Sequence, residues 1–122
     1  MAVAIIAYAT GARTATPTAM ALQSAKRARG LIVVIDCTAI AASPSVVFTI
    51  QGYDPTSGKY YTILASAAIV GTGTTVLRVF PGATAAANLV ANDVLPASWR
   101  IIATHGDADS ITYSVSALPI MD

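Results

Sequence analysis

The stretch 110–117 reads SITYSVSA, and its polar and apolar side chains alternate at every position. A period of two is typical of a β-strand, because successive side chains point to opposite faces of a sheet. Ser and Thr occupy one face, as expected for a strand with one side in a core and the other in solvent. The predicted core face consists of Ile111, Tyr113, Val115 and Ala117.

The same alternation recurs in two earlier stretches, 45–51 (SVVFTIQ) and 98–104 (SWRIIAT). Each therefore predicts a strand with one buried face. The predicted buried side chains are Val46, Phe48 and Ile50 in the first stretch and Trp99, Ile101 and Ala103 in the second.

Three further stretches predict strands of a different kind. Residues 30–37 (GLIVVIDC) and 74–80 (TTVLRVF) are apolar on both faces apart from Asp36 and Arg78. This pattern favours strands near the middle of a sandwich or beneath a neighbouring subunit. Residues 3–8 (VAIIAY) form a shorter apolar strand at the start of the chain.

Two polar turns connect these strands. In 53–61 (YDPTSGKYY), Asp54 can cap the turn, Pro55 presets φ, and Gly58 can adopt a left-handed conformation. Such a turn sets the register of a hairpin, and a slip of one residue would move the core side chains to the solvent. Residues 105–110 (HGDADS) join the last two strands in the same way.

Short strands separated by Gly and Pro predict an all-β fold, an antiparallel β-sandwich of either the immunoglobulin-like or the jelly-roll-like form. At most one short helix is expected, at 83–93, where an irregular loop fits equally well. The 122 residues form a single domain, 1–122. Residues 1–18 are a possible N-terminal strand or arm, because 10–18 (TGARTATPT) resembles a linker.

The composition predicts a subunit of an assembly. Charged residues make up 11% of the chain, against roughly 25% in an average soluble domain. Glu is absent, and the mean hydropathy is +0.65. Thirteen charged side chains cannot cover the surface, so apolar patches should remain exposed, and such patches mark contacts with partners. We expect a homo-oligomer, either a trimer or a dimer.

Several other classes of protein are disfavoured. The apolar runs, such as 31–35, are far shorter than the about 20 residues of a membrane-spanning helix. The opening residues lack the basic start of a signal peptide, and the single Cys37 fits a buried small hydrophobe, so synthesis without oxidative folding is expected. A net charge of +1 gives no general attraction to nucleic acid or to an anionic membrane.

No catalytic or cofactor site is expected. His105, Asp107 and Asp109 lie within five residues and could in principle ligate a metal or act in acid–base chemistry. No second cluster supplies further ligands, however, and Asp and Gly are ordinary residues of a hairpin turn. The sequence also has no nucleophile elbow, so we expect a protein that is not an enzyme and binds no cofactor or metal.

Lys26, Arg27 and Arg29 form the only charge run. Positive side chains directly before the apolar run 31–35 act as gatekeepers against aggregation, and they also solvate a turn. Contact with a partner is the second interpretation. Nucleic-acid binding is the weakest, because no aromatic residues interleave with the charges.

The aromatic residues leave a carbohydrate-binding module open, since exposed rings can stack on sugars. Trp99 is in phase with Ile101 and is therefore assigned to the core. Tyr60 and Tyr61 point to opposite faces of one strand, so only one of them can join Tyr53 on a binding surface.

Three stretches resemble small virion proteins of tailed bacteriophages, and within that group the capsid decoration (cement) proteins. They are QGYDPTSGKYYTILAS (51–66), TTVLRVFPG (74–82) and ANDVLPASWRIIATHGDADSITYSVSA (91–117), and the similarity covers about residues 30–118. The resemblance implies a β-sandwich that is made in the cytoplasm of a bacterial host and binds the outside of the virion shell. It also implies the major capsid protein as partner. A tail or head-to-tail connector component is the alternative within the virion.

The N-terminal strand is the candidate for assembly contacts. A lone apolar strand must pair with its own sheet or with that of a neighbour, and pairing with a neighbour adds hydrogen bonds for little mass. The candidate contact residues are Val3, Ile5, Ile6 and Tyr8 of this strand, together with Lys26, Arg27 and Arg29.

Overall fold

The computed structural model describes residues 5–19, 21–23 and 28–121, and none of them lies in a helix. No segment of this described part is therefore a helix long and apolar enough to cross a membrane. The strands are β1 (Ile5–Arg13), β2 (Leu22–Gln23), β3 (Ala28–Ile40), β4 (Val46–Asp54), β5 (Lys59–Ala65), β6 (Gly73–Val79), β7 (Val90–Ala91), β8 (Ser98–His105) and β9 (Ile111–Met121).

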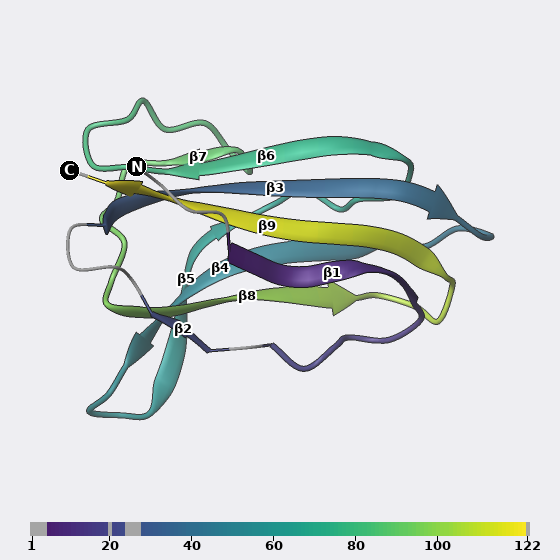
Figure 1. Cartoon of the computed structure of the whole chain (residues 1–122), viewed down its shortest axis with the longest axis horizontal. Helices are drawn as coiled ribbons and strands as arrows, with labels where there is room; N and C mark the ends of the chain where they lie inside the picture. The colour runs from purple at the N-terminus through teal and green to yellow at the C-terminus, as the bar shows by residue number, and fades with distance from the viewer. Residues whose placement is uncertain (1–4, 20, 24–27, 122) are drawn as a thin grey trace.

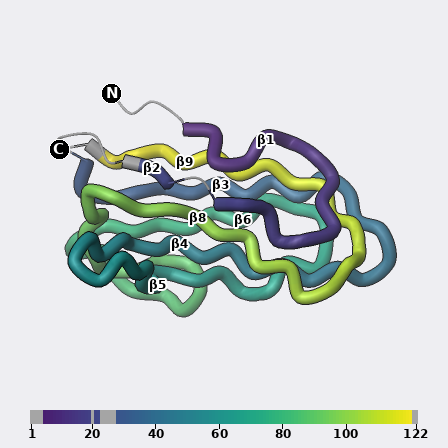
Figure 2. The backbone as a smooth tube through the Cα atoms, turned by 90° about the horizontal axis from the view of Figure 1, so that it is seen from below, coloured from purple at the N-terminus to yellow at the C-terminus, as the bar shows by residue number. Residues whose placement is uncertain are grey.

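The strands form two sheets packed face to face, which confirms the predicted β-sandwich. One sheet has the order β1-β9-β3-β6-β7 and the other the order β2-β8-β4-β5. Figure 1 shows β3, β6 and β9 running side by side, and Figure 2 shows β4 and β5 on the opposite side of the molecule from β1 and β9.

The pairing of the strands is nested. The β4–β5 hairpin is innermost, and around it β3 pairs with β6, β2 with β8, and β1 with β9, each pair antiparallel. The first and last strands are thus neighbours in one sheet, whereas an immunoglobulin domain has them in different sheets. The order is that of a jelly roll, with β7 added in parallel beside β6. The strand pairing therefore distinguishes between the two forms that the sequence leaves open.

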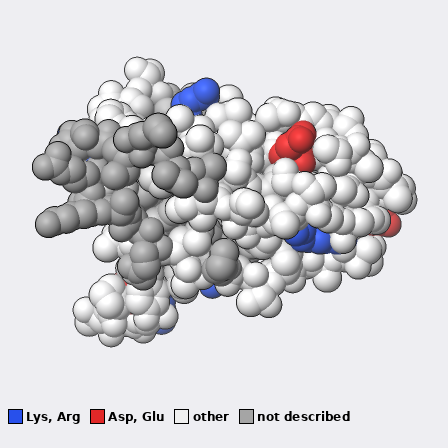
Figure 3. Space-filling model, viewed as in Figure 1, with Lys and Arg blue, Asp and Glu red and all other residues white. Residues whose placement is uncertain are grey.

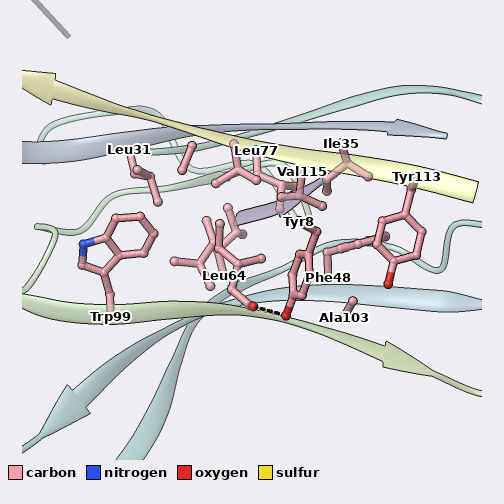
Figure 4. Packing of buried hydrophobic residues seen from close by; sticks show 14 of the residues in the cluster. Tyr8, Leu31, Ile35, Phe48, Leu64, Leu77, Trp99, Ala103, Tyr113 and Val115 are labelled. Carbon is pink, nitrogen blue, oxygen red and sulfur yellow. Dashed lines mark hydrogen bonds between the residues drawn. The ribbon is translucent and has the colours of Figure 1, made fainter. Parts of the chain in front are cut away.

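The core lies between the inward faces of the two sheets, and these are the faces that the alternating stretches predict. Tyr113 on β9 packs edge-on against Phe48 on β4, with ring centroids 5.0 Å apart. Trp99 on β8 is fully buried, as its phase with Ile101 predicts. Figure 4 shows these side chains filling the space between the sheets.

The two strands that are apolar on both faces lie side by side. β3 sits between β9 and β6, so its central position is confirmed. Its inward side chains, including Cys37 at 2% exposure, are buried, while its outward Ile32 and Val34 are only partly covered. β6 is nearer the edge, because β7 pairs only with Arg78 and Val79.

The polar turn at 53–61 connects β4 and β5 as predicted. Gly58 has a φ of 73°, and its N–H donates to the carbonyl oxygen of Asp54 at 2.8 Å. The Asp54 carboxylate accepts hydrogen bonds from the Ser57 hydroxyl at 2.7 Å and from the Thr56 N–H at 3.1 Å. These hydrogen bonds lower the pKa of the Asp54 carboxyl, and the bond from the Ser57 hydroxyl has the largest effect.

Two segments needed the structure to decide between interpretations. Residues 83–93 contain no helix: 83–89 form an irregular loop that leads into β7, and Asn88 within it has a φ of 63°, outside the right-handed helical region. At the N-terminus, strand β1 continues to Arg13, through the first part of the expected linker. It pairs with β9 of its own chain, with register shifts between Ile6 and Tyr8 and between Tyr8 and Gly11.

Candidate functional site

The two acidic side chains near His105 are engaged in the β8–β9 turn. Asp109 accepts a hydrogen bond from the Ser43 N–H at 3.1 Å, and Asp107 accepts one from the N–H of Asp109 at 3.1 Å. Among the described residues, no three side chains of His, Cys, Asp or Glu are grouped so that they could hold a metal ion. These two Asp side chains therefore organise a loop.

His105 itself faces inward. Its Nε2 lies 3.0 Å from the hydroxyl of Tyr113, and its Nδ1 is buried without a hydrogen-bond partner. Burial first, and the Arg13 charge second, lower the pKa of His105, while Asp107 acts in the opposite direction. Burial also raises the pKa of Tyr113 to about 12. Both groups are thus neutral at pH 7, with Tyr113 fully buried and His105 partly buried.

Arg13 closes this end of the sandwich. Its guanidinium lies 4.6 Å from the centre of the Tyr113 ring and donates to the carbonyl oxygens of Tyr113 and Gly11, each at 3.0 Å, and of Ala9. A second tie comes from Thr16, whose hydroxyl accepts a hydrogen bond of 2.9 Å from the His105 N–H. The hydrogen bonds of Arg13 and Thr16 therefore hold β1 and the segment after it against β9 and β8.

The candidate contact residues of the N-terminal strand have different environments. Tyr8 is 6% exposed and belongs to the core of its own chain, and Ile5 packs partly against that core. Ile6 points outward and is 67% exposed. Arg29 is exposed on β3, whereas Val3, Lys26 and Arg27 lie outside the described residues. Of the candidate contact residues on the N-terminal strand that the structure describes, Ile6 is the one whose side chain is exposed to a partner.

Three of the four aromatic residues named for carbohydrate binding gather near the β4–β5 hairpin. Tyr53 and Tyr60 pair across the strands with ring centroids 5.0 Å apart. Tyr61 pairs with Gly52 instead, so the prediction of opposite faces for Tyr60 and Tyr61 is confirmed. Its ring lies where a Cβ on residue 52 would be, and it is 47% exposed.

Arg100 joins this cluster, which the sequence alone did not indicate. Its guanidinium lies 3.7 Å from the centre of the Tyr60 ring, and its Nε donates to the Gln51 side-chain oxygen at 2.7 Å. The pairing of β4 with β8 sets Arg100 opposite Gln51, so the contact depends on the register of distant strands. The cation covers part of the Tyr60 ring that a sugar would need.

An apolar hollow of about 370 Å³ opens beside β6. It is lined by residues 67–69, Thr75 and residues 87–89, and none of them is charged. The Asn88 amide donates to the Ala65 carbonyl oxygen at 3.1 Å, which ties the loop before β7 to the end of β5. Leu89 of this lining is 48% exposed, and Val70, the residue after the lining residue Ile69, is 60% exposed. The hollow has the size and lining to accept an apolar side chain.

The surface as a whole carries few charges, and the face shown in Figure 3 has only isolated Lys, Arg and Asp side chains. Six large apolar or aromatic side chains in the described part of the chain are exposed instead: Ile6, Ile40, Tyr61, Val70, Leu89 and Val94. Three of them lie on the loops that flank β6 and β7. The sequence indicates this exposed apolar surface through two runs without charged residues, 60–77 and 79–92.

Comparison with known proteins identifies no relative: no family model, no curated protein and no solved structure matches the chain.

Proposed function

We propose that the protein is a structural subunit that binds a larger protein assembly through its uncharged surface. The observation that carries this proposal is the uncharged hollow of about 370 Å³, with the exposed Leu89 in its lining and the exposed Val70 next in sequence to the lining residue Ile69. Exposed apolar patches on a soluble domain mark interaction sites. Of the possible catalytic cluster His105, Asp107 and Asp109, the two Asp side chains organise the β8–β9 turn and His105 contacts the Tyr113 hydroxyl.

The assembly that fits the sequence resemblance is the capsid of a tailed bacteriophage, with the major capsid protein as partner. A decoration protein that binds only the assembled shell stabilises it, since any ligand stabilises the state to which it binds. Many copies, each with a modest contact, then add their contributions. Such a role needs a rigid sandwich and a complementary surface, and no catalytic residue.

The test is the protein composition of purified virions, measured by quantitative mass spectrometry. A decoration protein is expected at an abundance close to that of the major capsid protein. A far lower copy number would favour a tail or head-to-tail connector component. Absence of the protein from the particles would overturn the virion proposal.

A carbohydrate-binding module is the second candidate, and the pairing of Tyr53 with Tyr60 on the outward face of one sheet favours it. Binding of the purified protein to a glycan array, lost on Tyr60→Ala and retained on Tyr61→Ala, would support this candidate. If no glycan is bound, the paired tyrosines serve the hairpin and its contact with Arg100.

A further inference from the structure

The first half of β6 is an open sheet edge. On the side away from β3, the N–H groups of Arg78 and Phe80 donate to the carbonyl oxygens of Leu89 and Ala91 at 2.9 and 3.1 Å. Backbone groups of a strand point to the same side at every second residue, so those of Thr74 and Val76 point to this side as well. The hydrogen bonds of the described residues leave these groups without a partner, because β7 ends its pairing at Arg78.

The other sheet edges in the described part of the chain carry devices that prevent strand addition. β1 has two register shifts and ends in Arg13, and β5 begins with Lys59 and pairs with β4 through an irregularity. β2 and β7 are only two residues long. Charges, bulges and short strands are the usual means of keeping an exposed edge from pairing. Residues 73–77 have none of them.

The chain segments around this edge are also uncharged, apart from Asp36 on β3, whose carboxylate accepts a hydrogen bond of 3.4 Å from the Thr74 hydroxyl. Residues 60–77 and 79–92 contain no Asp, Lys or Arg. Arg78, between these two runs, lies opposite Ile32 of β3 in the strand register, beyond the open length of the edge. Leu89 and the apolar hollow at Thr75 border the edge. A strand that pairs here must therefore be uncharged, and its own edge must also lack the charges, bulges and short length that prevent strand addition.

In this chain, the edge that meets both requirements is β6 itself. We propose that two copies associate through an antiparallel pairing of their β6 strands, related by a two-fold axis near Thr75. Thr74 of each copy then lies opposite Val76 of the other, and each pair exchanges two backbone hydrogen bonds. A two-fold interface brings the same patch of both subunits together, so Leu89, whose carbonyl oxygen accepts from the Arg78 N–H, lies beside the interface in both copies.

This dimer does not depend on what the subunit attaches to, and it is tested without any virion. The variant is Thr74→Pro, which removes an N–H that points to the open side and leaves the backbone hydrogen bonds to β3 intact, although it also removes the hydrogen bond from the Thr74 hydroxyl to Asp36. A second variant, Val76→Lys, places a charge on the edge, which is the device found on natural edges. The matched control is Thr10→Lys, an exposed position on β1 at the opposite edge of the same sheet.

Sedimentation velocity over a range of concentrations gives the oligomeric state, and circular dichroism checks the fold. The wild type and Thr10→Lys are expected to be dimers, and both β6 variants are expected to be folded monomers. Hydrogen exchange should show the amides of Thr74 and Val76 protected in the concentrated wild type and exchanging faster on dilution.

Three results would overturn the proposal. They are a wild type that stays monomeric at every concentration, a dimer that survives in a folded Thr74→Pro or Val76→Lys variant, and a dimer lost in Thr10→Lys alone, which would assign the interface to β1. If either β6 variant fails to fold, the concentration dependence of the Thr74 and Val76 amide exchange in the wild type decides the question.

Discussion

The hydroxyl of Tyr8 on β1 donates a hydrogen bond of 2.7 Å to the backbone carbonyl of Ile101 on β8, 93 residues away (Figure 4). β1 and β8 belong to different sheets, so this bond joins the two layers of the sandwich through the core. Burial of the Tyr8 hydroxyl raises its pKa, which keeps it a hydrogen-bond donor at any ordinary pH.

Tyr8→Phe is therefore expected to destabilise the fold by about 1 kcal/mol, because the ring stays in the core while the hydrogen bond to a buried carbonyl is lost. The measurement is chemical denaturation of both proteins. Tyr61→Phe is the control, since the Tyr61 ring is 47% exposed and its hydroxyl has no hydrogen bond within the described part of the chain. Equal effects of the two substitutions would contradict the role given to Tyr8.

Deletion of residues 2–9 is expected to lower the melting temperature strongly. It removes Tyr8 from the core and the first part of the β1–β9 pairing. Thermal unfolding followed by circular dichroism measures the loss. A truncated protein that melts at the wild-type temperature would show that β1 does not stabilise its own sandwich.

The stability should depend on pH through His105. The pKa of its imidazole lies below the ordinary value of 6.5, so the unfolded chain takes up a proton more readily than the folded one. The contribution of neutral His105 is then complete above pH 6.5 and is lost as the pH falls below that value.

Melting temperatures measured from neutral to mildly acidic pH check this expectation. The wild type should lose stability as the solution is acidified, and His105→Gln should lose less. Asp54 titrates in a separate window, since its lowered pKa affects stability only below its ordinary value of 3.8. Parallel curves for the wild type and His105→Gln would rule out His105 as the source.

Gly58→Val is expected to cost about 1–2 kcal/mol, because a β-branched side chain resists the positive φ of 73° at this position. Gly71→Val is the matched control, as its φ is outside the left-handed region and a Cβ there meets open space. The stabilities of the two variants are compared by their urea unfolding midpoints, measured at low protein concentration. If both variants shift the midpoint equally, the left-handed turn is not the cause.

Gly30→Ala is expected to destabilise the protein by about 1–3 kcal/mol through overpacking. A Cβ on Gly30 would press on the backbone carbonyl oxygen of Val79 and lie 2.8 Å from the Phe80 ring. At Gly11, the nearest atom to an added Cβ is 3.9 Å away, so Gly11→Ala should be tolerated. Comparable melting temperatures for the two alanine variants would contradict the close approach of β3 to β6.

Local patterns were enough to predict the longer strands and their buried faces, but not the two-residue strands β2 and β7. The alternation around Tyr113 and Phe48 identified the core, and the Asp54–Gly58 turn identified the hairpin, because each depends on neighbours in sequence. The nested strand order was not predictable, since which strands pair is decided by long-range contacts that leave no local signature.

The same limit applies to the candidate site. Ile6 was recognisable as an apolar residue of a short strand, but the burial of Tyr8 depends on Ile101 in the opposite sheet. The stacking of Arg100 on Tyr60 and the hollow at Thr75 arise where segments far apart in sequence meet. Only the lack of charge in 60–77 and 79–92 gave a sequence-level sign of that surface.

The nested strand order also governs how the chain reaches its folded state. The β4–β5 hairpin can close early, but β1 has no partner in its sheet until β9, the last strand, has been synthesised. Pairings between such distant segments make folding slow, because a large loss of chain entropy precedes the contacts that compensate for it. On the ribosome, β1 must therefore remain unpaired through most of translation. A nascent chain released before residue 111 therefore lacks the strand with which β1 pairs.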